Sequence, residues 1–266
     1  MIKLALFDMD GTLLDSDRQL PNDFSAYVKN LREYGVTVAI ASARPHMMLN
    51  VFPEDAGDLY ISGENGKIFY CGNKCLASFP LPYSDVKFIL DTVWPDDDIA
   101  TICFSDDIIY TTERDRLRFI DFGRADLFTK APHAPDESTE TCQLHCLCRG
   151  GYEMADRKVT DEYAFLREKY DLELSGSGWI DIMEKGRDKG DAVTFFADYF
   201  GYSPDEIAVF GDSENDIPMF RRAKYSFAMK NAMQDIKKEA AFITKEDNNH
   251  CGALKALWEL VLSQNK

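Results

Sequence analysis

Two aspartates separated by one residue follow an apolar segment near the start of the sequence. Asp8 and Asp10 come directly after the apolar run of residues 2–7, which predicts a strand buried on both faces of a parallel sheet. One carboxylate can attack phosphorus as a nucleophile, and a second can protonate a leaving group and then deprotonate water. Gly11, which follows, lets a ligand approach the backbone. An acidic turn that ends the strand is the alternative, and this segment alone does not decide between the two.

A second acidic segment follows another apolar run. Asp212 comes after the expected strand at 207–210, in the place that Asp8 takes after the first strand, and Asn215 and Asp216 follow it. Buried carboxylates repel each other unless a cation, a proton or hydrogen-bond donors lie close by. Mg²⁺ prefers oxygen ligands and typically takes one or two carboxylates. The segment therefore predicts a magnesium site, with an ordinary acidic turn as the alternative.

Ser42 and Lys189 are candidates for holding a phosphate group. Ser42 follows the expected strand at 36–41, where its hydroxyl could donate to a phosphate oxygen or cap a helix. Lys189 lies at the start of an expected helix at 188–200, where a cation opposes the helix dipole. Conflicts of this kind cluster at functional sites, although a solvated lysine is the simpler interpretation.

The expected secondary structure brings these residues to one edge of a sheet. Strands at 2–7, 36–41 and 59–62 with a helix at 23–34 indicate a doubly wound, Rossmann-like α/β fold with a mostly parallel sheet. In such sheets the functional crevice lies at the carboxyl ends of the strands. Residues that are distant in the sequence can therefore meet there.

The pattern changes in the middle of the chain. Residues 83–186 predict an α+β module, with helices at 85–93 and 162–169 and strands at 100–104, 108–112, 141–148 and 179–183. The first pattern returns with the helix at 188–200 and with strands at 207–210, 225–229 and 241–244. We therefore expect a discontinuous α/β core formed by residues 1–82 and 187–266, with residues 83–186 inserted as a second domain.

Composition excludes several classes of partner. The chain has 266 residues and a net charge of −16, which argues against nucleic acids and anionic membranes as partners. It has no apolar run of the roughly 18 residues that span a bilayer. Seven scattered cysteines, an odd number, predict reduced thiols and a cytoplasmic protein. The sequence leaves the oligomeric state open.

Two other segments contain residue types that bind metals. Strand alternation over residues 142–148 places Cys142, Cys146 and Cys148 on one face and turns His145 away, which argues against a shared zinc site. The run of aspartates at 96–98 has no calcium-binding loop around it, and we expect solvated loop charges there.

The four chemistry-bearing segments together resemble the motifs of the haloacid dehalogenase superfamily. The first and last are the most specific, and the resemblance covers nearly the whole chain. The insertion is similar to the cap domain of the Cof-type subclass IIB. The matching positions are Asp8-Met9-Asp10-Gly11-Thr12, Ser42, Lys189 and Gly211-Asp212-Ser213-Glu214-Asn215-Asp216, with Glu64-Asn65-Gly66 and Asn231 typical of the subclass.

The resemblance implies a catalytic mechanism. Asp8 would form an aspartyl-phosphate, and Asp10 would serve as general acid and then as general base. Ser42 and Lys189 would hold the phosphoryl oxygens, with Gly11 beside them. The substrates implied are small phosphate esters, such as sugar phosphates.

The resemblance also implies a metal site. Mg²⁺ would bind the Asp8 and Asp212 carboxylates and the backbone carbonyl of Asp10. Asp216 and Asn215 would support that site through water or orientation.

Two alternatives to a phosphatase remain open, and the second motif departs from the family pattern. The same residues could serve a phosphotransferase or mutase, or a phosphate-ester sensor with little turnover, although the intact set of motif residues weighs against the sensor. The family usually has Thr-Gly-Arg at the second motif, where this chain has Ser42-Ala43-Arg44. Serine keeps the hydroxyl, Ala43 adds a Cβ, and Arg44 is retained. The sequence leaves open whether Arg44 contacts substrate.

Overall fold

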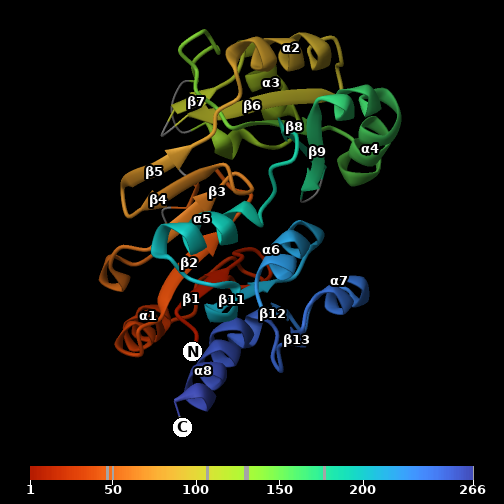
Figure 1. The fold of residues 1–266 in the computed structure, drawn as a ribbon. Helices are drawn as coiled ribbons and strands as arrows, with labels where there is room; N and C mark the ends of the chain where they lie inside the picture. The colour runs from red at the N-terminus through yellow and green to blue at the C-terminus, as the bar shows by residue number, and fades with distance from the viewer. Residues whose placement is uncertain (46–47, 50, 106–107, 129–131, 176–177, 266) are drawn as a thin grey trace. The chain divides into compact units, whose positions relative to one another are not determined.

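The chain divides into two compact units in the computed structural model (Figure 1). The structure describes residues 1–45, 48–49, 51–105, 108–128, 132–175 and 178–265. Unit 1 consists of Met1–Ser78 and Asp188–Lys266, and unit 2 of Phe79–Arg187. One sequence-based expectation, a helix capped by Ser42, falls partly on residues 46–47 and 50, which lie outside the described residues.

Unit 1 is built on a mostly parallel sheet. Its described strands lie in the order β13-β12-β11-β1-β2-β3-β4-β5. The pairs from β13 to β3 are parallel, and β4 and β5 are antiparallel additions at one edge. The strands are β1 (Leu4–Phe7), β2 (Thr37–Ala41), β3 (Tyr60–Gly63), β4 (Ile68–Cys71), β5 (Lys74–Ser78), β11 (Ile207–Gly211), β12 (Tyr225–Ala228) and β13 (Phe242–Ile243).

The apolar runs of the sequence form the middle of this sheet. All residues of β1 and β11 are buried, as expected of parallel strands covered on both faces. Phe7 of β1 stacks on Phe210 of β11 with ring centroids 4.8 Å apart, and Phe210 stacks on Phe227 of β12 at the same separation. This row of rings joins three neighbouring strands. The parallel pairings of the sheet confirm the expected doubly wound fold.

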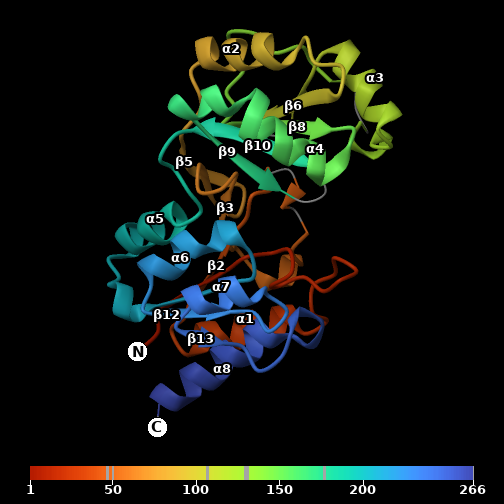
Figure 2. The same ribbon diagram turned by 90° about the vertical axis from the view of Figure 1, so that its right-hand side faces the viewer.

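Helices cover both faces of the sheet in unit 1. In Figure 2, α1 and α8 lie on one face and α5 and α6 on the other. The helix α1 buries Phe24, Val28 and Leu31, and α5 ends at Gly201, whose left-handed conformation suits glycine. The helices of this unit are α1 (Phe24–Glu33), α5 (Asp191–Phe200), α6 (Ile217–Arg222), α7 (Gln234–Glu239) and α8 (Gly252–Gln264).

Unit 2 contains an antiparallel sheet with helices. Its described strands lie in the order β7-β6-β8-β10-β9. One face packs its apolar side chains against α2 and α4, with Val86, Ile89 and Val159 in the shared core. The elements are α2 (Tyr83–Val93), β6 (Ile99–Ser105), β7 (Ile108–Tyr110), α3 (Glu113–Asp121), β8 (Gln143–Cys148), α4 (Gly151–Arg157), β9 (Tyr170–Ser175) and β10 (Trp179–Glu184).

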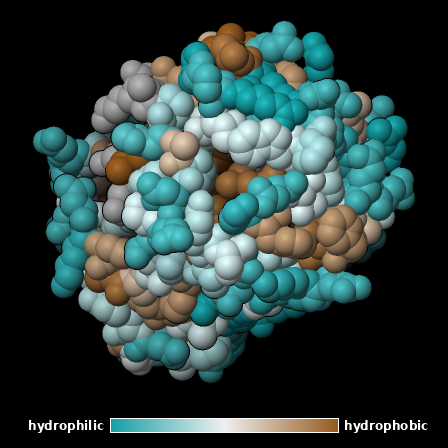
Figure 3. Space-filling view, turned by 90° about the horizontal axis from the view of Figure 1, so that it is seen from above, coloured by the Kyte–Doolittle hydropathy of each residue, from teal (hydrophilic) through white to brown (hydrophobic). Residues whose placement is uncertain are grey.

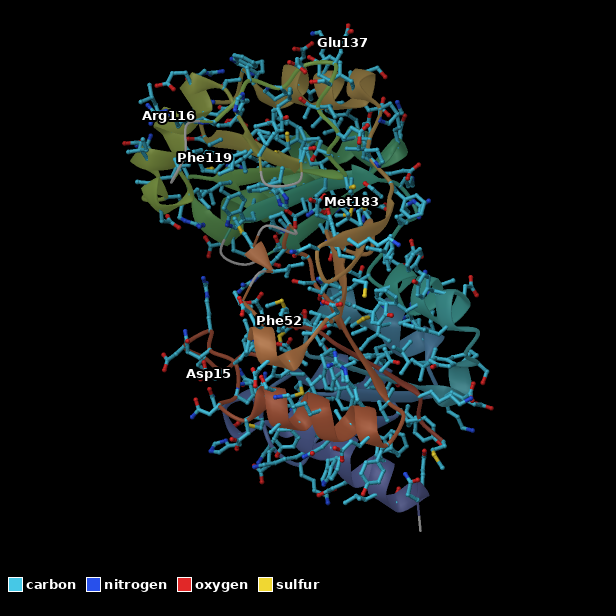
Figure 4. The ribbon with its side chains drawn as sticks, turned by 90° about the vertical axis from the view of Figure 1, so that its left-hand side faces the viewer. Asp15, Phe52, Arg116, Phe119, Glu137 and Met183 are labelled. Atoms are coloured by element: carbon cyan, nitrogen blue, oxygen red, sulfur yellow. The ribbon has the colours of Figure 1, made fainter. Side chains whose placement is uncertain are left out.

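Three elements of unit 2 were not expected. These are β9, α4 and α3. Figure 4 labels two residues of α3, Arg116 and Phe119. The helix α3 begins at a side-chain cap, because the Thr112 hydroxyl accepts a hydrogen bond from the Asp115 amide at 3.1 Å. Phe119 is fully buried and stacks on Trp179, so tertiary packing holds this polar helix in place.

The expected helix at 162–169 is wrong. The structure has a π-helical segment at Lys158–Glu162 and a 3₁₀ segment at Ala164–Glu168. The buried ammonium of Lys158 binds Asp96 and Glu162, and the Tyr163 hydroxyl donates to Asp96 at 2.8 Å. These contacts hold Lys158 inside, and the Tyr163 amide donates to the Lys158 carbonyl at 2.7 Å, a bond over five residues that widens the helix there. The pair with Lys158 corrects the expectation of a solvated charge for Asp96, whereas the side chain of Asp97 is 91% exposed, as expected.

The expected alternation is confirmed for Cys146, Cys148 and His145, whereas Cys142 precedes the strand β8. Cys146 and Cys148 lie in the apolar core of this unit. His145 lies on the opposite face of the sheet, where its Nδ1 is 2.7 Å from Asp181 Oδ1. Among the described residues these cysteines form no metal-binding group with His145.

Hydrophilic side chains predominate on the face of the molecule shown in Figure 3, where apolar side chains gather in separate patches. This distribution agrees with the charged fraction of the sequence, 29%. None of the described helices combines the length and apolar character that crossing a bilayer requires.

Candidate active site

Three neighbouring strands of unit 1 carry the candidate residues at their carboxyl ends. In register, Phe7 of β1 pairs with Ile40 of β2 and with Phe210 of β11. Asp8, Ser42 and Asp212 therefore follow strands that lie side by side (Figure 1). The Asp8 amide continues the ladder by donating to the Phe210 carbonyl at 2.9 Å. Parallel pairing thus brings segments about 200 residues apart to one edge of the sheet.

Three carboxylates meet at this edge. Oxygen atoms of Asp8, Asp212 and Asp216 lie within 4.8 Å of one another. Asp216 is fully buried, and its Oδ2 accepts hydrogen bonds from the amides of Asp212 at 2.8 Å and Ser213 at 3.0 Å. The turn after β11 is therefore closed by Asp216. The Asp212 carboxylate accepts a hydrogen bond from the Thr12 hydroxyl at 3.2 Å.

Lys189 supplies the cation that this cluster needs. Its side chain is 1% exposed, and its ammonium donates to Asp8 Oδ1 and, at 2.6 Å, to Asp216 Oδ1. It directly precedes Gly190, the N-cap of α5, so the start of the helix directs it into the cluster. The structure thus excludes a solvated lysine at this position.

Burial and crowding shift the proton affinities of these groups. Burial raises the pKa of Asp8 well above its usual range, and the charges of Asp216 and Asp212 add to the shift against the opposing charge of Lys189. Burial and the Asp216 charge raise the pKa of Asp212 to about 6. Burial lowers the pKa of Lys189, but the charges of Asp216 and Asp8 outweigh it and the net shift is upward. Lys189 is therefore a permanent cation among carboxylates that repel one another.

The donor set fits a divalent cation. Among the described residues, none gives Asp8 Oδ2 a hydrogen bond, although this oxygen is buried. A buried carboxylate oxygen without a partner is costly, and a bound cation would satisfy it. The ligand atoms are all oxygens, which suits Mg²⁺. Asp8 and Asp212 are the residues placed to hold such an ion, and the backbone carbonyl of Asp10 remains a predicted ligand.

Asp212 makes the metal-free protein sensitive to pH. Its folded-state pKa of about 6 lies above the ordinary value of 3.8, so the folded state binds the proton more tightly than the unfolded state. Between about pH 4 and about pH 6 this group therefore removes stability as the pH rises. We expect Asp212→Asn to gain stability over the wild type across that range, in denaturant titrations with EDTA. A difference that stays constant with pH would contradict this, and added Mg²⁺ is expected to favour the wild type instead.

The carboxylate of Asp212 lies so close to the backbone of Gly11 that only glycine fits at this position. The backbone of Gly11 has a φ of +80°, and a Cβ added there would lie 2.4 Å from Asp212 Oδ2. Asn231 holds this turn by donating to the Gly11 carbonyl at 2.8 Å. The role of Gly11 in phosphate binding remains a prediction, but its absence of a side chain has a clear structural cause.

Ser42 and Arg44 lie next to the carboxylate edge. Ser42 is buried, and its Oγ accepts a hydrogen bond from the Arg44 amide at 3.1 Å. The Arg44 guanidinium binds Asp10 through two hydrogen bonds, Nε to Oδ2 at 2.8 Å and Nη2 to Oδ1 at 2.5 Å. The contact that the structure shows for Arg44 is thus with the second aspartate of the first motif.

A left-handed turn packs against the segment of Ser42. Glu64 and Asn65 have φ angles of 49° and 52°, values that are uncommon for residues other than glycine. Their amides donate to the carbonyls of Arg44 at 3.0 Å and Ser42 at 3.1 Å. Asn215 donates to Asn65 Oδ1 at 3.3 Å and so links the turn to the segment of Asp212. Strained turns of this kind are found where the surrounding structure holds a site in place.

Sequence reasoning missed one residue that supports this edge. Asn248 is buried, donates from Nδ2 to the Leu14 carbonyl at 2.9 Å, and donates its amide to Asn231 Oδ1 at 3.2 Å. It thereby connects Asn231 to the loop after Asp10. An asparagine between polar residues carries no sequence signal for this role.

The sequence profile of haloacid dehalogenase-like hydrolases matches residues 5–257. This chain belongs to that family. Among its relatives, the phosphoglycolate phosphatase of Thermoplasma volcanium is 28% identical over 92% of this chain and 92% of its own length. The HMP-PP phosphatase of Escherichia coli strain 55989 is 27% identical over 90% of this chain and 88% of its own length.

Solved structures agree on the fold of this hydrolase. A haloacid dehalogenase-like hydrolase from Bacteroides thetaiotaomicron superposes with a TM-score of 0.82 at 20% identity, covering 98% of this chain and 100% of the other. The resemblance drawn from the four motifs is confirmed. The relatives described above are named phosphatases, in agreement with the expected enzyme class, a phosphoric monoester hydrolase.

Proposed function

We propose that this hydrolase is a Mg²⁺-dependent phosphatase that cleaves small phosphate monoesters through an aspartyl-phosphate on Asp8. The observation that carries the proposal is the Asp8 carboxylate, which Lys189 holds by one oxygen while the other oxygen has no hydrogen-bond partner among the described residues. Such a carboxylate is fixed in orientation and lies beside a cation, Lys189, that would neutralise an incoming phosphate.

In the first step, a carboxylate oxygen of Asp8 attacks phosphorus and the bond to the leaving oxygen breaks. Asp10 donates its proton to that oxygen, so the leaving group departs as a neutral alcohol. Lys189 and the Ser42 hydroxyl hold the phosphoryl oxygens, where their charge and donor capacity offset the charge of the phosphoryl group. Gly11 leaves room for the group beside the backbone.

In the second step, water attacks the phosphorus of the aspartyl-phosphate. Asp10, now a carboxylate, takes the proton of the water, and the bond between phosphorus and the Asp8 oxygen breaks. Inorganic phosphate leaves and Asp8 is a carboxylate again. Mg²⁺ bound by Asp8 and Asp212 would neutralise charge on the phosphoryl group. Asp216 keeps both Lys189 and the turn of Asp212 in place, and Asn215 fixes the neighbouring turn.

The proposed substrates are phosphorylated metabolites with a small hydroxylated leaving group, such as sugar phosphates. The support is the family together with relatives named for different phosphate compounds. Those names differ from one another, so the class of phosphate esters is common to them and a single ester is not. Residues 83–186, as an inserted cap domain, are proposed to select the leaving group.

A panel of phosphate esters tests this function. Inorganic phosphate released from sugar phosphates, polyol phosphates, nucleoside monophosphates and p-nitrophenyl phosphate is measured with Mg²⁺ and with EDTA. We expect release with Mg²⁺ that EDTA abolishes, in the absence of any acceptor other than water. No release from any ester would overturn the proposal, and release only when a sugar acceptor or a bisphosphate activator is present would identify a phosphotransferase instead.

A further inference from the structure

The carboxylate of Asp10 is held in a fixed position although it is half exposed. Its side chain is 51% exposed, yet the guanidinium of Arg44 binds both of its oxygens at 2.8 and 2.5 Å. Two parallel hydrogen bonds fix the plane of a carboxylate as well as its distance. An exposed aspartate without such a partner would move freely between rotamers.

Arg44 is itself fixed by the segment that carries Ser42. The Arg44 amide donates to Ser42 Oγ at 3.1 Å, and its carbonyl accepts from the Glu64 amide at 3.0 Å. Because the Ser42 oxygen accepts this bond through a lone pair, its O–H remains available to donate to a phosphate oxygen. The three residues from Ser42 to Arg44 thus connect the proposed phosphate donor to the proposed acid and base.

We propose that Arg44 is the positioning residue for Asp10 in both steps of the reaction. The inference rests on the proposed function and adds an assignment for the arginine of the second motif. In the first step the protonated carboxyl of Asp10 keeps acceptor lone pairs through which Arg44 holds it, and after the proton has passed to the leaving oxygen Arg44 binds the carboxylate produced. Each carboxylate oxygen keeps a further lone pair, so the bound carboxylate can still accept the proton of the attacking water in the second step.

Two other roles for Arg44 predict different kinetics. If the guanidinium bound the transferred phosphoryl group directly, its loss would affect every ester equally, because that group is common to all of them. If the pair with Asp10 were an ordinary surface ion pair, its loss would leave activity unchanged. A positioning residue for the acid instead matters most when the leaving group needs a proton.

The dependence on the leaving group therefore tests the inference. The ratio kcat/KM, which reports steps up to the first irreversible one, is measured for p-nitrophenyl phosphate and for an alkyl phosphate drawn from the panel. We expect Arg44→Ala to lower kcat/KM for the alkyl ester about 10- to 100-fold and for the nitrophenyl ester by less than about 3-fold, because nitrophenolate leaves without protonation. Arg44→Lys keeps the positive charge but cannot make two parallel hydrogen bonds, so its kcat/KM for the alkyl ester should lie between those of the wild type and Arg44→Ala.

An equal loss for both esters, or no loss for either, would overturn the inference. In an Asp10→Asn background, Arg44→Ala should cause little further loss, because the group that it positions is already absent. Arg221→Ala, which breaks an exposed ion pair of unit 1 with Glu239, is the matched control and should leave both ratios unchanged. If the wild type hydrolyses no ester, the proposed function itself fails, whereas equal losses in an active enzyme reject the role of Arg44 alone.

Discussion

Asp8→Asn is expected to abolish phosphate release while the protein stays folded. The amide keeps an oxygen that can accept the hydrogen bond of Lys189, but it cannot attack phosphorus. Loss of a covalent nucleophile is expected to lower turnover by at least about 10⁴-fold, as it does in a serine protease. The measurement is phosphate release from the best ester of the panel with Mg²⁺ present.

The same change should not weaken the metal-free fold. Burial raises the pKa of Asp8, so a neutral side chain removes an unfavourable charge from the cluster. In EDTA we expect Asp8→Asn to unfold at the same or a higher denaturant concentration than the wild type. Asp235→Asn, on the exposed surface of α7, is the matched control and should retain full activity. More than a few per cent of wild-type turnover in Asp8→Asn would exclude Asp8 as the nucleophile.

Of the substitutions proposed for this site, Lys189→Met is expected to produce the largest loss of stability. Methionine fills a similar volume, but the carboxylates of Asp8 and Asp216 lose the cation that both of them bind. Removing one partner of a buried ion pair costs about 3–5 kcal/mol, because the remaining charge is buried without compensation. The free energy of unfolding, from denaturant titration in EDTA near neutral pH, measures this loss, and activity should disappear with it.

The stability loss of Lys189→Met should shrink wherever the carboxylate charges are reduced or compensated. Lowering the pH protonates carboxylates whose pKa is raised, such as Asp212 with a pKa of about 6, so the variant should lose less stability near pH 5 than near pH 7. Mg²⁺ should restore part of the stability by supplying positive charge. Lys238→Met, at an exposed ion pair with Asp235, serves as the control. A loss below about 1 kcal/mol for Lys189→Met at neutral pH would show that Lys189 does not balance the cluster.

Local sequence determined the sheet edge at which the site lies. The apolar runs before Asp8 and Asp212 are long enough for a strand and lack polar alternation, so they have to be covered on both faces. In a parallel sheet the residues that follow such strands lie at one edge, and the tertiary structure then pairs β1 with β11. The first and fourth motifs could be assigned from the sequence because strand and motif are contiguous in it.

Other features depended on contacts between distant residues. Local periodicity predicted a regular helix at 162–169, whereas the structure has π-helical and 3₁₀ segments, with Lys158 paired to Asp96, 62 residues away. The sequence pattern favoured a surface position for Lys189, whereas in the structure the start of α5 directs it towards Asp8 and Asp216. The bidentate pair of Arg44 with Asp10 likewise joins the ends of two strands. Sequence determined which residues end the strands, whereas only the tertiary structure decided which charges compensate one another, because a buried charge is stable only beside partners brought from elsewhere in the chain.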